Sequence, residues 1–333
     1  MGTQSPFLMD KWDHMNKKRA VLLVNLGTPE QATTKSVRAF LKSFLLDKRV
    51  VDMPRLFWLP ILYLVILPFR APRVSKLYQK IWEKKGSPLR ILSESLNEKV
   101  ALALEKDNVK CVLAMTYGAP SIANTLQKLS DEGITELTII PLYPQYSVST
   151  TAPVFDQVGR FIKGQINFPG ITFKNNYHDH PLYIDALCQS IQAHWLNHGR
   201  AEKLIFSFHG IPQRYVEKGD PYQWQCEQSV ALVVKQLGLN SQDYLIAYQS
   251  RMGREAWLMP YVDLELKSMA NEGCSSVDII CPAFATDCLE TLEEMAMQNK
   301  KIFIEAGGKD FHYISCLNDE RSHIELLRTL ALN

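Results

Sequence analysis

The chain has 333 residues, of which 46% are hydrophobic and 22% are charged, and its formal net charge is +2. This length favours two domains of about 150 residues each, and the composition predicts large buried cores rather than a disordered or fibrous chain. The balanced charge, with no basic run longer than Lys17, Lys18 and Arg19, argues against a nucleic-acid partner.

The cysteines and the N-terminus both favour a cytoplasmic protein. Seven cysteines are scattered along the chain and never form a CxxC pair, which favours reduced thiols over a disulfide framework or a zinc site. The first 16 residues lack the apolar core of a signal peptide. We therefore expect them to form a frayed tail.

The first half of the chain predicts strands that alternate with helices. Apolar runs of strand length lie at residues 19–26, 109–115 and 136–140, and helical spacing of apolar residues lies at 34–46, 91–105 and 122–131. Strands that alternate with helices are typical of a parallel α/β sheet.

An uncharged apolar run of fourteen residues, 56–69, interrupts this pattern. A membrane-spanning helix needs about 20 residues, and Pro60 and Pro68 are expected to break the run further. We expect a buried or lip-forming segment. Contact with membrane lipid or with an apolar ligand is the alternative.

The strand ends of the first half recur in the second half in the same order. Strand 204–208 ends in HGIP where the first strand ends in LGTP, and strands 244–248 and 277–280 match the other two. These matches predict two similar βαβ-type halves, residues 17–158 and 159–333. The first half is about 50 residues longer between its first two strands. This insertion, at about 44–90, would lie over the crevice as a hydrophobic lip.

His209 follows strand 204–208 directly and precedes Gly210. Ligands of open α/β sheets bind at the carboxyl ends of the strands, and a glycine there allows close approach. This placement makes His209 a candidate functional residue, with a structural hydrogen-bonding histidine as the alternative.

A group of acids follows strand 277–280. On a helix after Ala285, the residues Asp287, Glu290 and Glu294 would fall at i, i+3 and i+7 and share one face. Ordinary acidic N-terminal helix chemistry is the alternative. If functional, these carboxylates would share a cleft with His209.

Five segments of the chain together resemble signature segments of the ferrochelatase family, whose members insert ferrous iron into protoporphyrin IX to make protohaem. They read LGTPE, PLYPQYSVSTT, SFHGIPQRYVEKGDPY, YQSRMGREAWLMPY and CPAFATDCLETLEE. The resemblance covers residue 19 to about residue 330. It implies a chelatase-like α/β fold of two similar Rossmann-like domains, each with a parallel four-stranded sheet flanked by helices, and an active-site cleft between them.

The resemblance also implies roles for single residues. His209 matches the family's essential histidine, a proposed acceptor of a pyrrole proton, and Glu290 matches its invariant glutamate. Both would contact the substrate Fe²⁺ transiently, and Asp287 and Glu294 would extend a metal or proton path along a π-type helix. The implied porphyrin-binding residues are Leu26, Ser87, Tyr117, Tyr143 and Trp257.

Departures from the family pattern refine these expectations. Leu26 stands where coproporphyrin-using members have tyrosine, which favours protoporphyrin IX as the substrate. Val148 stands where some members have a cluster-binding cysteine, and the chain stops at Asn333 without a cysteine-rich extension. We therefore expect no iron–sulfur cluster and no other cofactor. The expected protein is a cytoplasmic monomer with peripheral contact to the inner membrane face through the lip.

Two rival functions stay open at this stage. A cobalt or nickel chelatase of the same fold would share the geometry of metal insertion. A haem or porphyrin carrier would use His209 as an axial ligand, would catalyse nothing and would have no need of Glu290.

Overall fold

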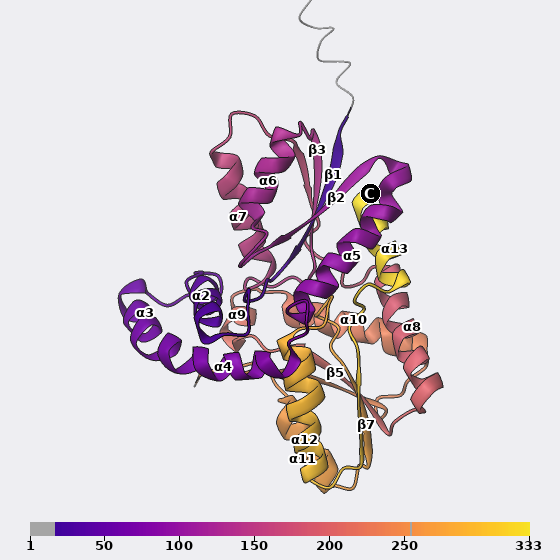
Figure 1. Ribbon diagram of the computed structural model, residues 1–333. Coiled ribbons are helices and arrows are strands. Elements are labelled where there is room, and N and C mark those ends of the chain that lie inside the picture. Colours follow the sequence, from indigo (N-terminus) through magenta and orange to yellow (C-terminus); the bar gives the residue numbers. More distant parts are fainter. Residues whose placement is uncertain (1–16, 254) are drawn as a thin grey trace, which may run out of the picture.

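The computed structural model describes residues 17–253 and 255–333, so the expected N-terminal tail lies outside the described residues. It contains two four-stranded parallel sheets with the strand orders β2-β1-β3-β4 and β6-β5-β7-β8 (Figure 1). The strands of the first sheet are β1 (Arg19–Asn25), β2 (Val109–Met115), β3 (Glu136–Pro141) and β4 (Gly170–Phe173). Those of the second are β5 (Lys203–His209), β6 (Tyr244–Gln249), β7 (Ser276–Ile280) and β8 (Asp310–Ile314). The predicted α/β class with paired parallel sheets is confirmed.

Helices cover both sheets. The helices of the first half are α5 (Pro88–Leu104), α6 (Ile122–Asp131) and α7 (Thr151–Lys163). Those of the second half are α8 (Pro181–His198), α9 (Gln213–Glu217), α10 (Tyr222–Leu237), α11 (Val262–Asn271), α12 (Lys300–Glu305) and α13 (Arg321–Leu332). A short 3₁₀ turn, η3 (Glu105–Asp107), precedes β2.

The two halves are interlocked rather than merely adjacent. The C-terminal helix α13 packs against α5 and β3 of the first half as well as against α8 (Figure 1). One hydrophobic core runs continuously from Leu96 on α5 through Tyr183 on α8 to Leu326 on α13. The sheets are therefore fixed relative to one another by a shared apolar core, which is what a precise site between them requires.

The predicted boundary between residues 158 and 159 falls inside α7. β4 lies beyond this boundary yet pairs with β3, so the first sheet takes its last strand from the segment that we assigned to the second half. The sequence pattern missed β4 because it is only four residues long and partly exposed, and such a strand carries little periodic signal.

β1 occupies the middle of the first sheet and runs toward the centre of the molecule (Figure 1). Its residues from Ala20 to Asn25 are buried, as expected for a strand covered on both faces. Gly27 follows with φ +102°, and a Cβ built there would lie 1.7 Å from the carbonyl oxygen of Tyr117. Only glycine fits this approach between the ends of β1 and β2.

The insertion forms four helical segments: α2 (Thr34–Leu45), α3 (Arg55–Ile61), η2 (Leu62–Ile66) and α4 (Leu67–Ile81). From Arg55 to Ile81 the helix is continuous, so the expectation that Pro60 and Pro68 break the run was wrong. η2 is a π-helix in which the amide of Leu67 donates to Leu62. This wider turn directly precedes Pro68, and it accommodates a residue that has no N–H to donate.

The helix Arg55–Ile81 has one face inside the protein and one face exposed. Trp58, Leu62 and Leu67 are buried against α2, whereas Leu64 is 73% exposed and Phe69 is 76% exposed. The 27-residue helix is long and apolar enough to cross a membrane by length and composition, although the fourteen-residue run alone was too short. Length and composition alone do not show that this helix lies in a membrane. We refer to its exposed apolar side chains as the lip; they are Leu56, Phe57, Leu59, Ile61, Tyr63, Leu64, Val65 and Phe69.

Candidate active site

His209 is the last residue of β5, and its neighbour across the sheet is Gln249, the last residue of β6. Its Nδ1 lies 2.7 Å from the carbonyl oxygen of Gly210. A carbonyl oxygen can only accept a hydrogen bond, so Nδ1 carries the proton of the neutral ring. Nε2 then keeps its lone pair and is able to accept a proton from a substrate.

Glu290 begins the π-helix η4 (Glu290–Asn299), so the π-type helix implied by the resemblance is present. The side-chain amide of Gln249 donates to the Glu290 carbonyl oxygen at 3.2 Å, and its oxygen accepts from the Ser207 hydroxyl at 2.8 Å. Gln249 is 2% exposed. This buried amide therefore ties the first residue of η4 to the strand neighbour of His209.

Asp287 does not share a helix face with the other acids, because it lies before η4 and outside the helix. Its carboxylate accepts from the hydroxyls of Tyr313 at 2.6 Å and Thr291 at 3.0 Å, and from the Asn318 amide at 2.8 Å. The predicted i, i+3, i+7 stripe was wrong because these donors hold Asp287 at the helix entrance. Asp287 thereby anchors the start of η4.

Glu294 lies one turn after Glu290 and is largely buried. Ser250 donates to it through its backbone N–H, at 2.9 Å, and through its hydroxyl. The pKa of Glu294 is raised to about 7: burial raises it most, the bonds from Ser250 lower it, and the charge of Glu290 raises it. A carboxyl group with this pKa titrates near neutral pH.

The lip helix α4 packs against η4 and supplies charges that the sequence analysis did not single out. Burial lowers the pKa of Arg70, and the charge of Glu290 acts against this effect. Burial raises the pKa of Tyr78, and Glu290 raises it further. Lys80 forms an ion pair of 2.7 Å with the buried carboxylate of Glu293. The charge of Glu290 therefore acts on two side chains of the insertion, Arg70 and Tyr78.

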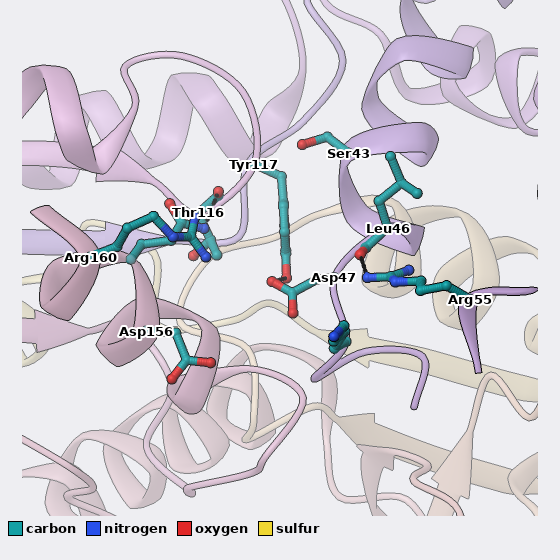
Figure 2. Close-up of a pocket in the computed structure, with 10 residues that line it drawn as sticks. Ser43, Leu46, Asp47, Arg55, Thr116, Tyr117, Asp156 and Arg160 are labelled. Atoms are coloured by element: carbon teal, nitrogen blue, oxygen red, sulfur yellow. Dashed lines mark hydrogen bonds between the residues drawn. The ribbon is translucent and has the colours of Figure 1, made fainter. Parts of the chain in front are cut away.

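A cavity of about 610 Å³ lies beside Tyr117, between the insertion and α7 (Figure 2). The Tyr117 hydroxyl points to Asp47 and donates to it at 3.0 Å, and the Tyr117 ring meets Phe44 edge to face. The wall is polar and charged; it is formed by Ser43, Leu46, Asp47, Lys48, Arg55, Thr116, Tyr117, Asp156, Gln157 and Arg160. His209 and Glu290 are not part of this wall.

The other implied porphyrin-binding residues lie at or near strand and helix ends. Leu26 follows β1, and its carbonyl accepts from the Tyr117 amide. Ser87 precedes α5 and accepts from the Thr28 hydroxyl at 2.9 Å. Trp257 forms an isolated antiparallel β-bridge with Pro212, and its ring packs beside Gly210. Tyr143, after β3, is buried, and burial raises its pKa.

Asn25 joins the two halves at the ends of their sheets. Its amide donates to Ser93 on α5 and to Thr286 just before Asp287, both at 3.0 Å, while its oxygen accepts from the amide of Leu26. Asn25 and Gln249 were missed by the sequence analysis. The sequence did carry a signal for them, because each is a polar residue at the end of an otherwise apolar strand. A polar side chain in such a place is buried only where it finds hydrogen-bond partners.

The fold defines the class of protein. SirB from Bacillus subtilis, solved with Fe³⁺, matches with a TM-score of 0.53 at 11% identity, over 95% of this chain and 96% of that chain. CbiX, described as the terminal enzyme for siroheme biosynthesis in denitrifying bacteria, matches with a TM-score of 0.50 at 13% identity, over 94% and 97%. At such identities the likeness concerns the fold alone, which is that of the chelatases.

Sequence comparison gives the family. The Ferrochelatase family model matches residues 18–333. The ferrochelatase of Aeromonas hydrophila subsp. hydrophila is 47% identical over 318 residues, 95% of this chain and 98% of the relative. That of Vibrio cholerae serotype O1 is 47% identical over 316 residues, with coverages of 95% and 98%. The chain belongs to the ferrochelatase family, so it is a metal-inserting enzyme of haem biosynthesis whose substrates are a porphyrin and ferrous iron.

Proposed function

We propose that the enzyme inserts Fe²⁺ into protoporphyrin IX, with His209 and Glu290 as its catalytic residues. The observation that supports this assignment is the hydrogen bond from Gln249 to Glu290, because Gln249 is also the strand neighbour of His209. One buried side chain thus links the start of η4 to the strand end that carries His209, at the carboxyl ends of parallel strands where ligands of such sheets bind.

The reaction removes two pyrrole protons and forms four bonds from nitrogen to Fe²⁺, so the product ring with its metal carries no added charge. Nε2 of His209 accepts a pyrrole proton, since Nδ1 is held as a donor by Gly210. Glu290 contacts the metal transiently, and Glu294, with its pKa near 7, passes protons or metal onward. Asp287 belongs to the same acidic path and fixes its start.

The porphyrin is an apolar disc with two carboxylates at its edge. The apolar surface near the site suits the faces of the disc, and the polar surface suits its edge. The lip and Leu26 suit the apolar faces. Tyr117, Ser87, Tyr143 and Trp257 suit the polar edge and its surroundings. Binding of the outer parts of the disc supplies the energy that bends the ring toward the inserted state.

The exposed apolar lip also bears on where the enzyme works in the cell. The enzyme works as a cytoplasmic monomer that contacts the inner membrane face through the lip, since apolar side chains as exposed as Leu64 and Phe69 suit a lipid surface. It needs no iron–sulfur cluster or other cofactor, since Val148 offers no thiolate where cluster-bearing relatives have cysteine.

An anaerobic insertion assay tests the reaction and the porphyrin together. Protoporphyrin IX is expected to be a better substrate than coproporphyrin III, and Fe²⁺ is expected to be inserted. Faster turnover of coproporphyrin III would overturn the porphyrin assignment. Insertion of Co²⁺ or Ni²⁺ without any insertion of Fe²⁺ would favour the rival chelatase.

Variants of His209 test the catalytic assignment. His209→Ala is expected to abolish insertion while porphyrin still binds, because the proton acceptor is lost and the apolar walls remain. His198→Ala, an exposed histidine on α8, is the matched control and is expected to insert iron at the normal rate. A carrier would instead purify with tightly bound haem and show no turnover in either variant or in the unaltered chain.

A further inference from the structure

A second group of histidines lies between α8 and the second sheet, far from His209. Asp278 is in the middle of β7 and is the strand neighbour of Leu204, near the start of β5, whereas His209 ends β5. His209 follows Leu204 by five residue steps along the strand, which corresponds to roughly 16 Å at about 3.3 Å per residue. Any chemistry at Asp278 is therefore separate from the insertion site.

Asp278 and His312 are direct neighbours on β7 and β8, and both point to the C-terminal end of α8. Nδ1 of His312 and Nε2 of His194 each lie 3.2 Å from Oδ1 of Asp278. The three atoms all lie within 4.8 Å of one another. Ligand atoms at about 2.1 Å from a tetrahedral ion are about 3.4 Å apart, so small side-chain rotations bring these three into coordination range.

His198 offers a fourth ligand. It follows His194 by one helical turn on α8, so both imidazoles lie on the same helix face. The ring of His198 stacks on that of His194 at 4.6 Å between centroids and lies 5.7 Å from that of His312. A helical HxxxH pair that faces an aspartate and a histidine on adjacent strands is a donor set of three nitrogens and one oxygen.

The carboxylate of Asp278 is held by donors outside this set. Its side chain is 1% exposed, and Oδ2 accepts from the Trp195 indole at 2.8 Å and from the Ala201 amide at 3.2 Å. These bonds direct Oδ1 at the histidines, as outer partners do in metal centres.

The cluster is open to solvent through a cavity of about 470 Å³. His194, His198 and His312 line it, together with Ser190, Asn197 and Lys300. Lys300 is the cation that faces the cluster from α12. An ion can therefore reach the histidines without passing through the protein interior.

We propose that His194, His198, His312 and Asp278 bind a divalent transition-metal ion of the zinc type, at a site distinct from that of iron insertion. Imidazole nitrogens with one carboxylate select Zn²⁺, Co²⁺ or Ni²⁺ over Mg²⁺ and Ca²⁺, which prefer oxygen ligands. The bound ion joins α8 to β7 and β8. It clamps the last turn of α8 onto the second sheet.

The test is equilibrium dialysis of Zn²⁺ against the full chain, purified without a histidine tag and stripped with a chelator. The unaltered protein, Ser190→Ala and His209→Ala are all expected to bind one Zn²⁺ at this site. His194→Ala and His312→Ala are each expected to bind it at least tenfold more weakly, because a ligand is lost. Ser190 lines the same cavity but offers no imidazole, so it is the matched control.

X-ray absorption of the Zn²⁺-loaded His209→Ala protein supplies a second readout that does not depend on a cluster variant folding. Three imidazole ligands at about 2.0–2.1 Å are expected. The proposal is overturned if His194→Ala and His312→Ala bind Zn²⁺ normally, if only His209→Ala loses it, or if the absorption spectrum shows no imidazole. In that case the cluster is a hydrogen-bonded His–Asp–His group and nothing more.

Discussion

Ser250 donates its backbone N–H and its hydroxyl to the carboxylate of Glu294, and it does so with a positive φ of 65°. A non-glycine residue rarely adopts this conformation. The strained turn after β6 therefore aims two donors at one buried acid of η4. Glu294 remains titratable near neutral pH because burial raises its pKa and these donors limit the rise.

The pKa of Glu294 predicts how stability depends on pH. The folded pKa of about 7 exceeds the usual 4.5, so between these values the folded protein holds a proton that the unfolded chain releases. Stability must then fall as pH rises through this window, by up to about 3 kcal/mol. Glu294→Gln is expected to remove this loss, so urea unfolding should show the variant to be more stable than the unaltered protein at pH 8 but not at pH 4.5. Exposed Glu98→Gln is the control, and an equal gain there would contradict the assignment.

Gly27 predicts a large backbone effect. Gly27→Ala places a Cβ 1.7 Å from the Tyr117 carbonyl oxygen at φ +102°, so the ends of β1 and β2 must move apart. We expect a loss of at least about 3 kcal/mol in the free energy of unfolding. Gly219→Ala separates the two causes, because Gly219 has φ +98° but no atom within 4 Å of its added Cβ. It should lose only about 1–2 kcal/mol, and equal losses would show that the close approach is unimportant.

Two neighbouring glutamates of η4 are expected to behave in opposite ways. Glu290→Gln should lower insertion at least about 100-fold with little effect on stability, since it removes a catalytic carboxylate. Glu293→Gln should keep the insertion rate but lower stability by about 0.5–1.5 kcal/mol, because a neutral amide accepts more weakly from Lys80 than the buried carboxylate does. Single-turnover insertion rates and thermal unfolding of both variants decide the matter. Normal insertion by Glu290→Gln would remove it from the catalytic assignment.

The lip predicts binding to lipid. Replacing the exposed Leu64 and Phe69 with serine is expected to weaken co-sedimentation with vesicles at least several-fold, since each removes apolar surface from the membrane contact. Folding should be unaffected because neither side chain is buried. Leu196→Ser, which is 87% exposed on α8, is the matched control. Vesicle binding that survives the lip change, or that fails equally in the control, would place the contact elsewhere.

Much of the fold followed from local patterns. β2 and α6 have the predicted bounds, and the other predicted strands differ by one residue at either end, because buried parallel strands are continuous apolar runs that end at proline or glycine. The resemblance to the ferrochelatases located His209 and Glu290 by motif. By contrast, β4 and the unbroken course of Arg55–Ile81 were not predicted, since one has little periodicity and the other depends on a π turn that tolerates Pro68.

The sequence by itself determined the class, the family, and the strand ends that carry the candidate catalytic residues, because these depend on short-range hydrophobic pattern and on motifs. Only the tertiary structure decided what surrounds them. Gln249, the strand neighbour of His209, binds the backbone carbonyl of Glu290, and Lys80 pairs with Glu293. Asp287 is held outside the helix by donors such as Tyr313. Such contacts join residues far apart in the chain, and no local pattern encodes which distant partner a buried polar group will find.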